Sequence, residues 1–253
     1  MIALATCFWK RPDLSRFFME YWHRLAGALP LLLYGAVSPE DPFYEEHLRV
    51  ASHLPVWRMF DVPNEKLWLK FDTLVAEHIR NDPEAKAVLQ GLLVMGSDDI
   101  ANRSYVRIVD VMLETCDFIQ PGSCIMFEPE TGLMSLLNGF DGGAGRAYSR
   151  HLLEKRNWHV WESNEDTFFS IDNHNKILAL NASRRSVTLP VTSDTPWQIM
   201  DIKSAEEKLN MWFWSDFSPE QNPLATWLDA RDTIERHFPD AFECTGAAPA
   251  SAA

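Results

Sequence analysis

The apolar run over residues 92–95 leads through Gly96 and Ser97 into two adjacent carboxylates, Asp98 and Asp99. Neighbouring acids repel one another, which costs stability unless a partner offsets their charge. A hard divalent cation such as Mg2+ or Mn2+ removes that cost, because such cations prefer carboxylate oxygen. The stretch therefore predicts a cation site that also serves a diphosphate. The alternative is that the acid pair only caps a helix over residues 100–111.

A glycine-rich loop over residues 141–145 is the second stretch with chemical potential. Glycines let the backbone approach a ligand closely, and the free N–H groups of a helix start bind sugar or phosphate oxygens. Arg146 and Arg150 would add positive charge there, although Arg150 is also typical of a solvated helix position. An ordinary surface turn is the alternative interpretation of this loop.

Further candidates lie downstream. Glu165 and Asp166 could deprotonate an acceptor hydroxyl, or form the acidic first turn of a helix. His174 could complete an oxygen-rich cation shell, although most single histidines are not ligands. Lys203 could contact a phosphate, and a surface ion pair is an equal alternative.

The first half of the chain alternates between apolar runs and segments with helical periodicity. The strands and helices that this pattern predicts must position the candidate residues. Strands are expected over residues 2–7, 31–34, 56–60 and 92–99. Helices are expected over residues 12–25, 38–51 and 67–79. Strand–helix alternation predicts an α/β fold with a mostly parallel central sheet flanked by helices. Ligands bind beyond the carboxyl ends of such strands, which is where Asp98 and Asp99 are expected.

The second half is less regular. Helices are expected over residues 105–116, 147–155 and 224–238, with a strand pair over 118–127, a hairpin over 177–189 and a strand over 197–203. The small-residue stretch 246–253 is typical of a disordered tail. We expect a single domain over residues 1–245, with a nucleotide half over about 1–115 and a smaller acceptor half over about 116–245.

Composition narrows the functional classes. The net charge of −13 makes nucleic acid a disfavoured partner unless basic residues gather locally. The four cysteines form no CxxC pair, which is typical of a reducing compartment. The N-terminus lacks a signal-peptide pattern, and no apolar stretch approaches the roughly 20 residues of a membrane span. We therefore expect a cytoplasmic protein without a membrane span.

The order of these motifs resembles small glycosyltransferases of the GT-A fold, closest to the family-2-like type with short bacterial and phage members. The resemblance spans about residues 1–215. It depends on Thr6 with Lys10-Arg11-Pro12, Lys70-Phe71-Asp72, Gly96-Ser97-Asp98-Asp99, residues 143–150, Glu165-Asp166 and Asp201-Ile202-Lys203. Ser97 stands where the family's DxD motif has its first acid, and residues 34–36 lack the acid that usually contacts uracil.

The resemblance implies a GT-A-like glycosyltransferase that uses Mn2+ or Mg2+ and a nucleotide-sugar donor, by default a UDP-sugar. The implied metal ligands are Asp99, Asp98 and His174. The implied donor-binding residues are Thr6, Arg11, Lys70, Asp98, Gly145, Arg146 and Lys203. The implied catalytic base is Asp166 or Glu165, with Asp172 as the alternative.

The acceptor hydroxyl is left open. A glycan or small molecule is the family's usual acceptor, and a hydroxymethylated pyrimidine in phage DNA is the alternative. DNA would require a basic face built from Arg103, Arg107, Arg146, Arg150, Lys155, Arg156, Arg184 and Arg185. Two further classes remain: a nucleotidyltransferase, although residues 8–12 lack the usual glycine-rich loop, and a non-catalytic interaction protein.

Overall fold

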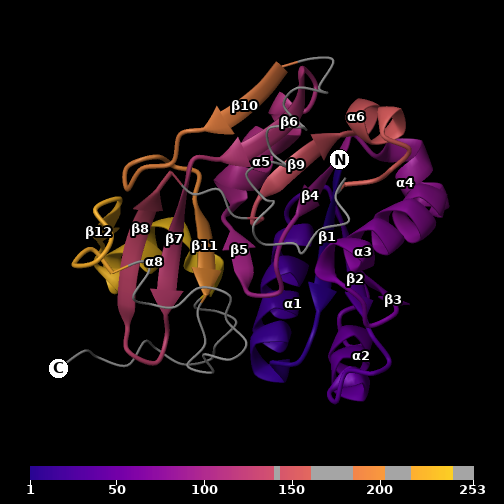
Figure 1. Ribbon diagram of the computed structural model, residues 1–253, viewed down its shortest axis with the longest axis horizontal. Coiled ribbons are helices and arrows are strands. Elements are labelled where there is room, and N and C mark those ends of the chain that lie inside the picture. Colours follow the sequence, from indigo (N-terminus) through magenta and orange to yellow (C-terminus); the bar gives the residue numbers. More distant parts are fainter. Residues whose placement is uncertain (140–142, 161–184, 203–217, 242–253) are drawn as a thin grey trace.

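The computed structural model describes residues 1–139, 143–160, 185–202 and 218–241 of the chain (Figure 1). Within them the strands form two sheets, and helices flank the larger one. No helix in these ranges is both long enough and apolar enough to cross a membrane.

The larger sheet has seven strands in the order β10-β6-β9-β4-β1-β2-β3. Their bounds are β1 Ile2–Phe8, β2 Leu31–Val37, β3 Trp57–Asp61, β4 Gly91–Val94, β6 Cys116–Pro121, β9 Arg146–Ser149 and β10 Arg185–Leu189. Strands β3, β2, β1 and β4 run parallel, and β9 lies antiparallel between β4 and β6. The mostly parallel sheet predicted from the sequence is confirmed.

Helices cover both faces of this sheet. Their bounds are α1 Pro12–Ala26, α2 Tyr44–Ser52, α3 Leu67–Thr73, α4 Pro83–Val88, α5 Arg103–Met112 and α6 Arg150–Lys155, with a π-helical turn at Leu74–His78 and a 3-10 turn at Ile79–Asn81 between α3 and α4. Strand β1 shows why both faces are apolar: Leu4 and Phe8 join one buried cluster with α1, while Ala5 and Cys7 join a second with Leu74. Because β1 is buried on both faces, nearly all of its residues are apolar, which explains the continuous apolar run in the sequence.

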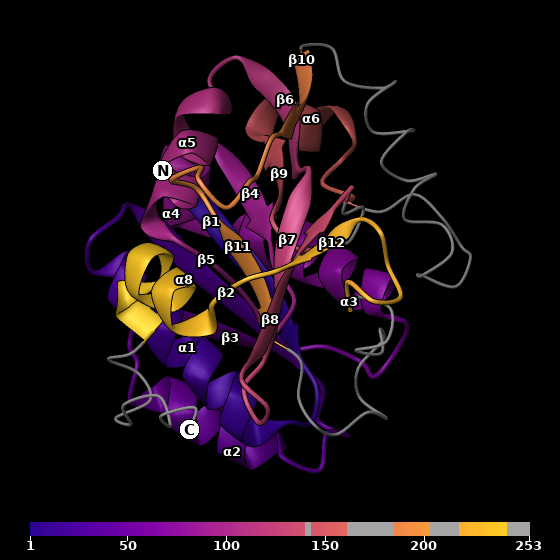
Figure 2. The ribbon, with the colours of Figure 1, turned by 90° about the vertical axis from the view of Figure 1, so that its left-hand side faces the viewer.

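The second sheet has five strands in the order β12-β8-β7-β11-β5. Their bounds are β5 Asp99–Ala101, β7 Ser123–Glu128, β8 Leu133–Asn138, β11 Ile199–Ile202 and β12 Ala225–Trp227. It lies to the left of the larger sheet in Figure 1, and in Figure 2, where that side faces the viewer, α8 (Ala230–His237) lies to the left of its strands. The chain passes from the larger sheet to the smaller one more than once, and one of these crossings is at Gly122, between β6 and β7.

The strand expected to end at Asp98 and Asp99 is shorter than predicted. Strand β4 ends at Val94, a turn closes when the Asp99 N–H donates to the Gly96 carbonyl at 3.2 Å, and Asp99 then begins β5 in the second sheet. The helix considered over residues 100–111 starts only at Arg103, where the Asn102 side chain caps the Tyr105 N–H. Asp98 and Asp99 therefore join two sheets and do not cap a helix.

Three helix predictions began too early. The helix expected from residue 38 begins at Tyr44, because residues 38–43 form turns in which Asp41 binds backbone N–H groups. The helix expected over 147–155 is β9 followed by α6, whose first turn is capped by Ser149. The helix expected over 224–238 is β12 followed by α8. Strand β8 was not predicted, and residues 177–184 of the expected hairpin lie outside the described ranges.

Candidate functional site

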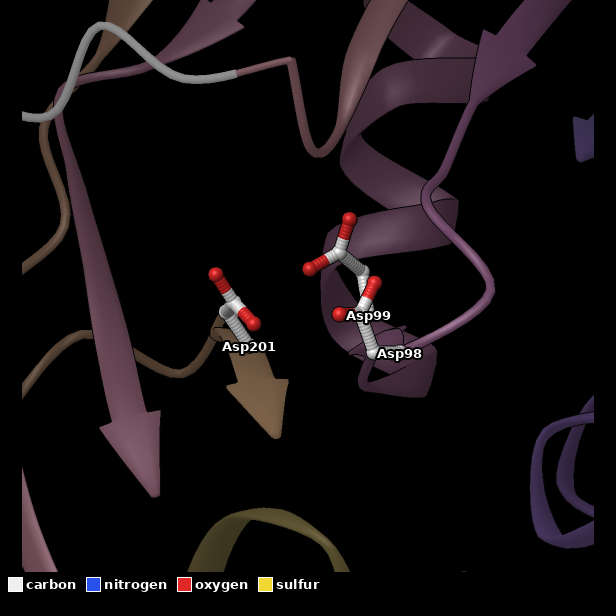
Figure 3. Close-up of side chains that lie close together, drawn as sticks. All are labelled: Asp98, Asp99 and Asp201. Carbon is white, nitrogen blue, oxygen red and sulfur yellow. The ribbon is translucent and has the colours of Figure 1, made fainter. Parts of the chain in front are cut away.

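Three carboxylates meet where the two sheets adjoin. Asp99 on β5 pairs directly with Asp201 on β11 in antiparallel register, and Asp98 precedes Asp99. One oxygen from each of the three lies within 4.8 Å of the others (Figure 3). Figure 3 shows Asp98 and Asp99 on one side and Asp201 facing them. Asp99 and Asp201 are each only 6% exposed, so the charges are drawn together in a poorly solvated place.

Backbone hydrogen bonds hold this acidic cluster in place. The Gly96 N–H donates to the Asp99 Oδ2 at 2.7 Å, and the Ile202 N–H donates to the Asp98 carbonyl at 2.8 Å. A Cβ at residue 96 would lie 2.5 Å from the Asp99 Oδ2. A side chain at residue 96 would therefore push the Asp99 carboxylate out of this position, and glycine leaves room for it.

Arg11 supplies a cation to the acidic cluster. Its Nη1 donates to the Asp98 Oδ2 at 2.8 Å. Burial lowers the pKa of the guanidinium, but Asp98, Asp201 and Asp99 together outweigh burial and raise it overall. One guanidinium offsets only one of the three negative charges.

The donor set fits a hard divalent cation. Three carboxylates offer oxygen ligands at mutual distances that one ion can span, and Mg2+ and Mn2+ prefer such ligands. Asp98 and Asp99 were candidates from the sequence, whereas Asp201 was not considered as a ligand. A charged residue inside the apolar run Ile199-Met200-Asp201-Ile202 is the signal that could have identified it, since acids are rarely buried without a partner.

The turn between β1 and α1 presents Arg11 to the cluster. Lys10 and Arg11 both have positive φ, 56° and 46°, a conformation that side chains rarely adopt. The Lys10 N–H donates to the Asp41 Oδ2 at 2.6 Å, and that carboxylate also faces the buried His47 Nε2 at 3.4 Å. Asp41 and His47 thus support a strained turn next to the acidic cluster.

Stability should fall on mild acidification because of His47. Burial lowers its pKa below the ordinary 6.5, more than Asp41 raises it. As the pH falls through about 6.5, the unfolded chain binds a proton that the folded chain does not, so the free energy of unfolding decreases until the lowered pKa is reached. Burial also lowers the pKa of His237, so this histidine likewise reduces the free energy of unfolding as the pH falls.

Urea unfolding between pH 8 and pH 5 measures this dependence. His47→Gln should unfold with a smaller loss of stability over that interval than the wild-type chain. His53→Gln, which changes an exposed histidine of the same region, is the matched control variant. An unchanged slope in His47→Gln would show that the buried imidazole is not the group responsible.

Lys70 on α3 lies near the end of β1 and is 6% exposed. Its Nζ donates to the neutral Asn64 Oδ1 at 2.9 Å and lies 4.5 Å from the centre of the Trp9 ring. Burial lowers the pKa of this ammonium, against the opposing effects of Cys7, Asp41 and Glu40. The buried side chain of Thr6 is nearby on β1, and its hydroxyl has no hydrogen-bond partner among the described residues.

The glycine loop does not lead into a helix. Gly145 (φ 75°) donates its N–H to the Val94 carbonyl at 3.0 Å, and its own carbonyl accepts from the Tyr105 hydroxyl at 2.6 Å. Arg146 begins β9 with no exposed surface. The helix start that suggested a ligand-facing loop is therefore wrong, and the donor-binding role of Gly145 and Arg146 stays a prediction.

Several candidates lie outside the described residues. They are Glu165, Asp166, Asp172, His174 and Lys203. The structure brings together Asp98, Asp99, Arg11 and the additional Asp201, and it places Lys70 and Thr6 around the end of β1.

Several solved structures are similar to this one. A mannosyltransferase from Pyrobaculum calidifontis, solved with GDP-Man and Mn2+, matches with a TM-score of 0.54 and 11% identity over 100% of this chain and 76% of its own. S. aureus TarS residues 1–349 matches with a TM-score of 0.52 and 9% identity over 79% of this chain. The same fragment with UDP-GlcNAc matches with a TM-score of 0.50 and 11% identity over 94% of this chain and 72% of its own.

The chain spans only part of the TarS chains, 60% of the 1–349 fragment and 37% of the longer TarS chain. No protein-family model and no curated protein sequence matches the chain. At such low identity the structural likeness establishes the architecture, which agrees with the fold expected from the motifs. The chain therefore has the GT-A-like fold of nucleotide-sugar glycosyltransferases.

Proposed function

We propose that the chain transfers a sugar from a nucleotide-sugar donor to a hydroxyl acceptor, with the help of a divalent cation. The observation that carries the proposal is the acidic cluster of Asp98, Asp99 and Asp201, which lies beside the carboxyl ends of β1 and β4. Ligands of open α/β sheets bind at that edge. The similar mannosyltransferase, solved with GDP-Man and Mn2+, supports the choice of ligand class.

Different residues of the chain would bind the cation and the donor. Asp99 and Asp201, both buried, would hold the cation, with Asp98 as the third ligand. A bound divalent cation would stabilise the negative charge that develops on the leaving diphosphate. Lys70 would contact the donor, because its buried ammonium donates to a neutral acceptor, the Asn64 Oδ1.

The acceptor hydroxyl must lose its proton as its oxygen bonds to the sugar. Asp166 or Glu165 would accept that proton in an inverting reaction, with Asp172 as the alternative. His174 and Lys203 are proposed as an additional cation ligand and a phosphate contact. These five assignments derive from the family resemblance and from the residue types.

A UDP-sugar is the default donor of the proposal. Strand β2 ends in Ala36 and Val37, so this position lacks the acid that usually contacts uracil. For the acceptor, a glycan or small molecule is favoured over DNA. Of the basic residues that DNA would require, Arg146 is fully buried, and Arg103 and Arg150 form ion pairs with Asp240 and Glu154.

Thermal unfolding with UDP, GDP, CMP or TDP, each with and without Mn2+, tests the proposal. One nucleotide should raise the melting temperature, and the rise should require Mn2+, because a ligand that binds only the folded state stabilises it. No shift with any nucleotide in either condition would contradict the proposal. Release of pyrophosphate from a nucleoside triphosphate and a sugar phosphate would instead indicate a nucleotidyltransferase.

A further inference from the structure

The guanidinium of Arg11 occupies a ligand position of the acidic cluster. Its Nη1 lies 2.8 Å from the Asp98 Oδ2, and Asp99 and Asp201 act on its charge as well. The side chains of Arg11 and Asp98 are 14% and 18% exposed, so solvent weakens the pair only in part. The cluster therefore already binds one cation, and that cation belongs to the chain.

The backbone that carries Arg11 is fixed from both sides. Arg11 is the N-cap residue of α1, and its carbonyl accepts the Ser15 N–H at 2.9 Å. On the other side the Lys10 N–H is bound by Asp41 at 2.6 Å. With the main chain held in this way, only rotation of the long side chain can move the guanidinium.

A divalent cation and this guanidinium would compete for the Asp98 carboxylate. The guanidinium holds the Asp98 Oδ2 at 2.8 Å, and Asp98 is also one of the three carboxylates that would bind the ion. A divalent ion bound by three carboxylates carries more charge than a guanidinium bound by one. An ion that takes the Asp98 Oδ2 would leave the guanidinium in need of another anion.

We propose that Arg11 is an internal counter-cation of the acidic cluster, which a divalent cation displaces from Asp98 so that the guanidinium can bind the donor's diphosphate. The inference depends on the cation and donor site proposed above. An arginine fork suits phosphate oxygens, because its N–H groups can donate in pairs. Cation binding and donor binding are thereby coupled through one residue.

The affinities of Arg11→Gln for Mn2+ and for a nucleoside diphosphate test the inference, because they should change in opposite directions. Without nucleotide, Mn2+ should bind about tenfold more tightly than in the wild type, because its competitor is gone. With saturating Mn2+, the nucleoside diphosphate should bind about tenfold more weakly. Free Mn2+ can be followed by electron paramagnetic resonance, and nucleotide binding by calorimetry.

Arg16→Gln is the matched control. Arg16 also lies on α1, but it pairs with Glu46 at 2.8 Å, so the variant removes the same charge without changing the cluster's own contact. Both affinities should stay close to the wild-type values. If Arg11→Gln does not fold, Arg11→Lys replaces it, with Mn2+ binding expected to be at least threefold tighter because a single-point donor competes less well.

Unchanged or weaker Mn2+ binding in a folded Arg11 variant would overturn the inference. Weaker binding would mean that Arg11 holds the carboxylates in position and does not compete with the ion. If the wild type binds Mn2+ and a nucleotide while the Arg11 variants behave like it, only the inference fails. If the wild type binds neither, the proposed function fails together with it.

Discussion

Replacing Asp99 with asparagine is expected to abolish metal-dependent nucleotide binding while the chain stays folded. Asp99 follows Asp98 in the chain and pairs with Asp201 across the two strands. Because Asp99 is only 6% exposed, a water molecule cannot easily take the place of its carboxylate as a ligand. Loss of one charged ligand should weaken Mn2+ binding at least about 100-fold, because changes to residues that merely support ligands already cost 10–100-fold. Asparagine keeps an oxygen for the Gly96 N–H, which preserves the turn.

Calorimetric titration of Mn2+ and of the stabilising nucleotide, with a melting curve for each variant, measures this effect. Asp110→Asn is the control, since it removes an acid that pairs with the N-terminal amine at 3.2 Å and is not a member of the acidic cluster. That variant should bind both ligands as the wild type does. Wild-type Mn2+ affinity in Asp99→Asn would show that the cluster does not hold the ion.

Replacing Gly145 with alanine should destabilise the fold by about 2–4 kcal/mol. A Cβ there would lie 2.1 Å from the Ile199 Cδ1, and the φ of 75° disfavours any side chain. Left-handed backbone costs alanine about 1 kcal/mol, and repacking a filled core adds about 1–3 kcal/mol. Because Ile199 begins β11, which carries Asp201, the change would also disturb the acidic cluster.

Urea denaturation of two further variants tests whether the loss of stability comes from the steric clash with Ile199. Gly143→Ala should cost little, since a Cβ at residue 143 meets nothing within 4 Å. In an Ile199→Val background, which lacks Cδ1, the cost of Gly145→Ala should shrink, as a double-mutant cycle would show. Equal costs in both backgrounds would contradict the packing explanation.

The parallel core of the fold could be predicted because its signals are local. Strands β1 and β2 are continuous apolar runs, and the helix opened by Pro12 shows a clear apolar face. Burial on both sheet faces imposes these patterns on the chain itself. For the same reason Asp98 and Asp99, which interrupt an apolar run, could be recognised as a site.

The rest depends on contacts between distant segments. Asp201 becomes a candidate ligand only because β11 pairs with β5, and this pairing joins residues about a hundred positions apart. Strand β9 is four residues long, too short for a period to emerge, and its strand state comes from pairing with β4 and β6. Gly145, which directly precedes β9, leaves room for the Ile199 side chain, and no local sequence pattern reveals this contact.

The most direct test of the central claim is a titration of the wild-type chain with Mn2+, followed by electron paramagnetic resonance, with and without the stabilising nucleoside diphosphate. We expect one Mn2+ per chain at the acidic cluster, bound more tightly when the nucleotide is present, and lost in Asp201→Asn. Wild-type chain that leaves all Mn2+ free in both conditions, or an Asp201→Asn variant that binds it equally well, would contradict the claim.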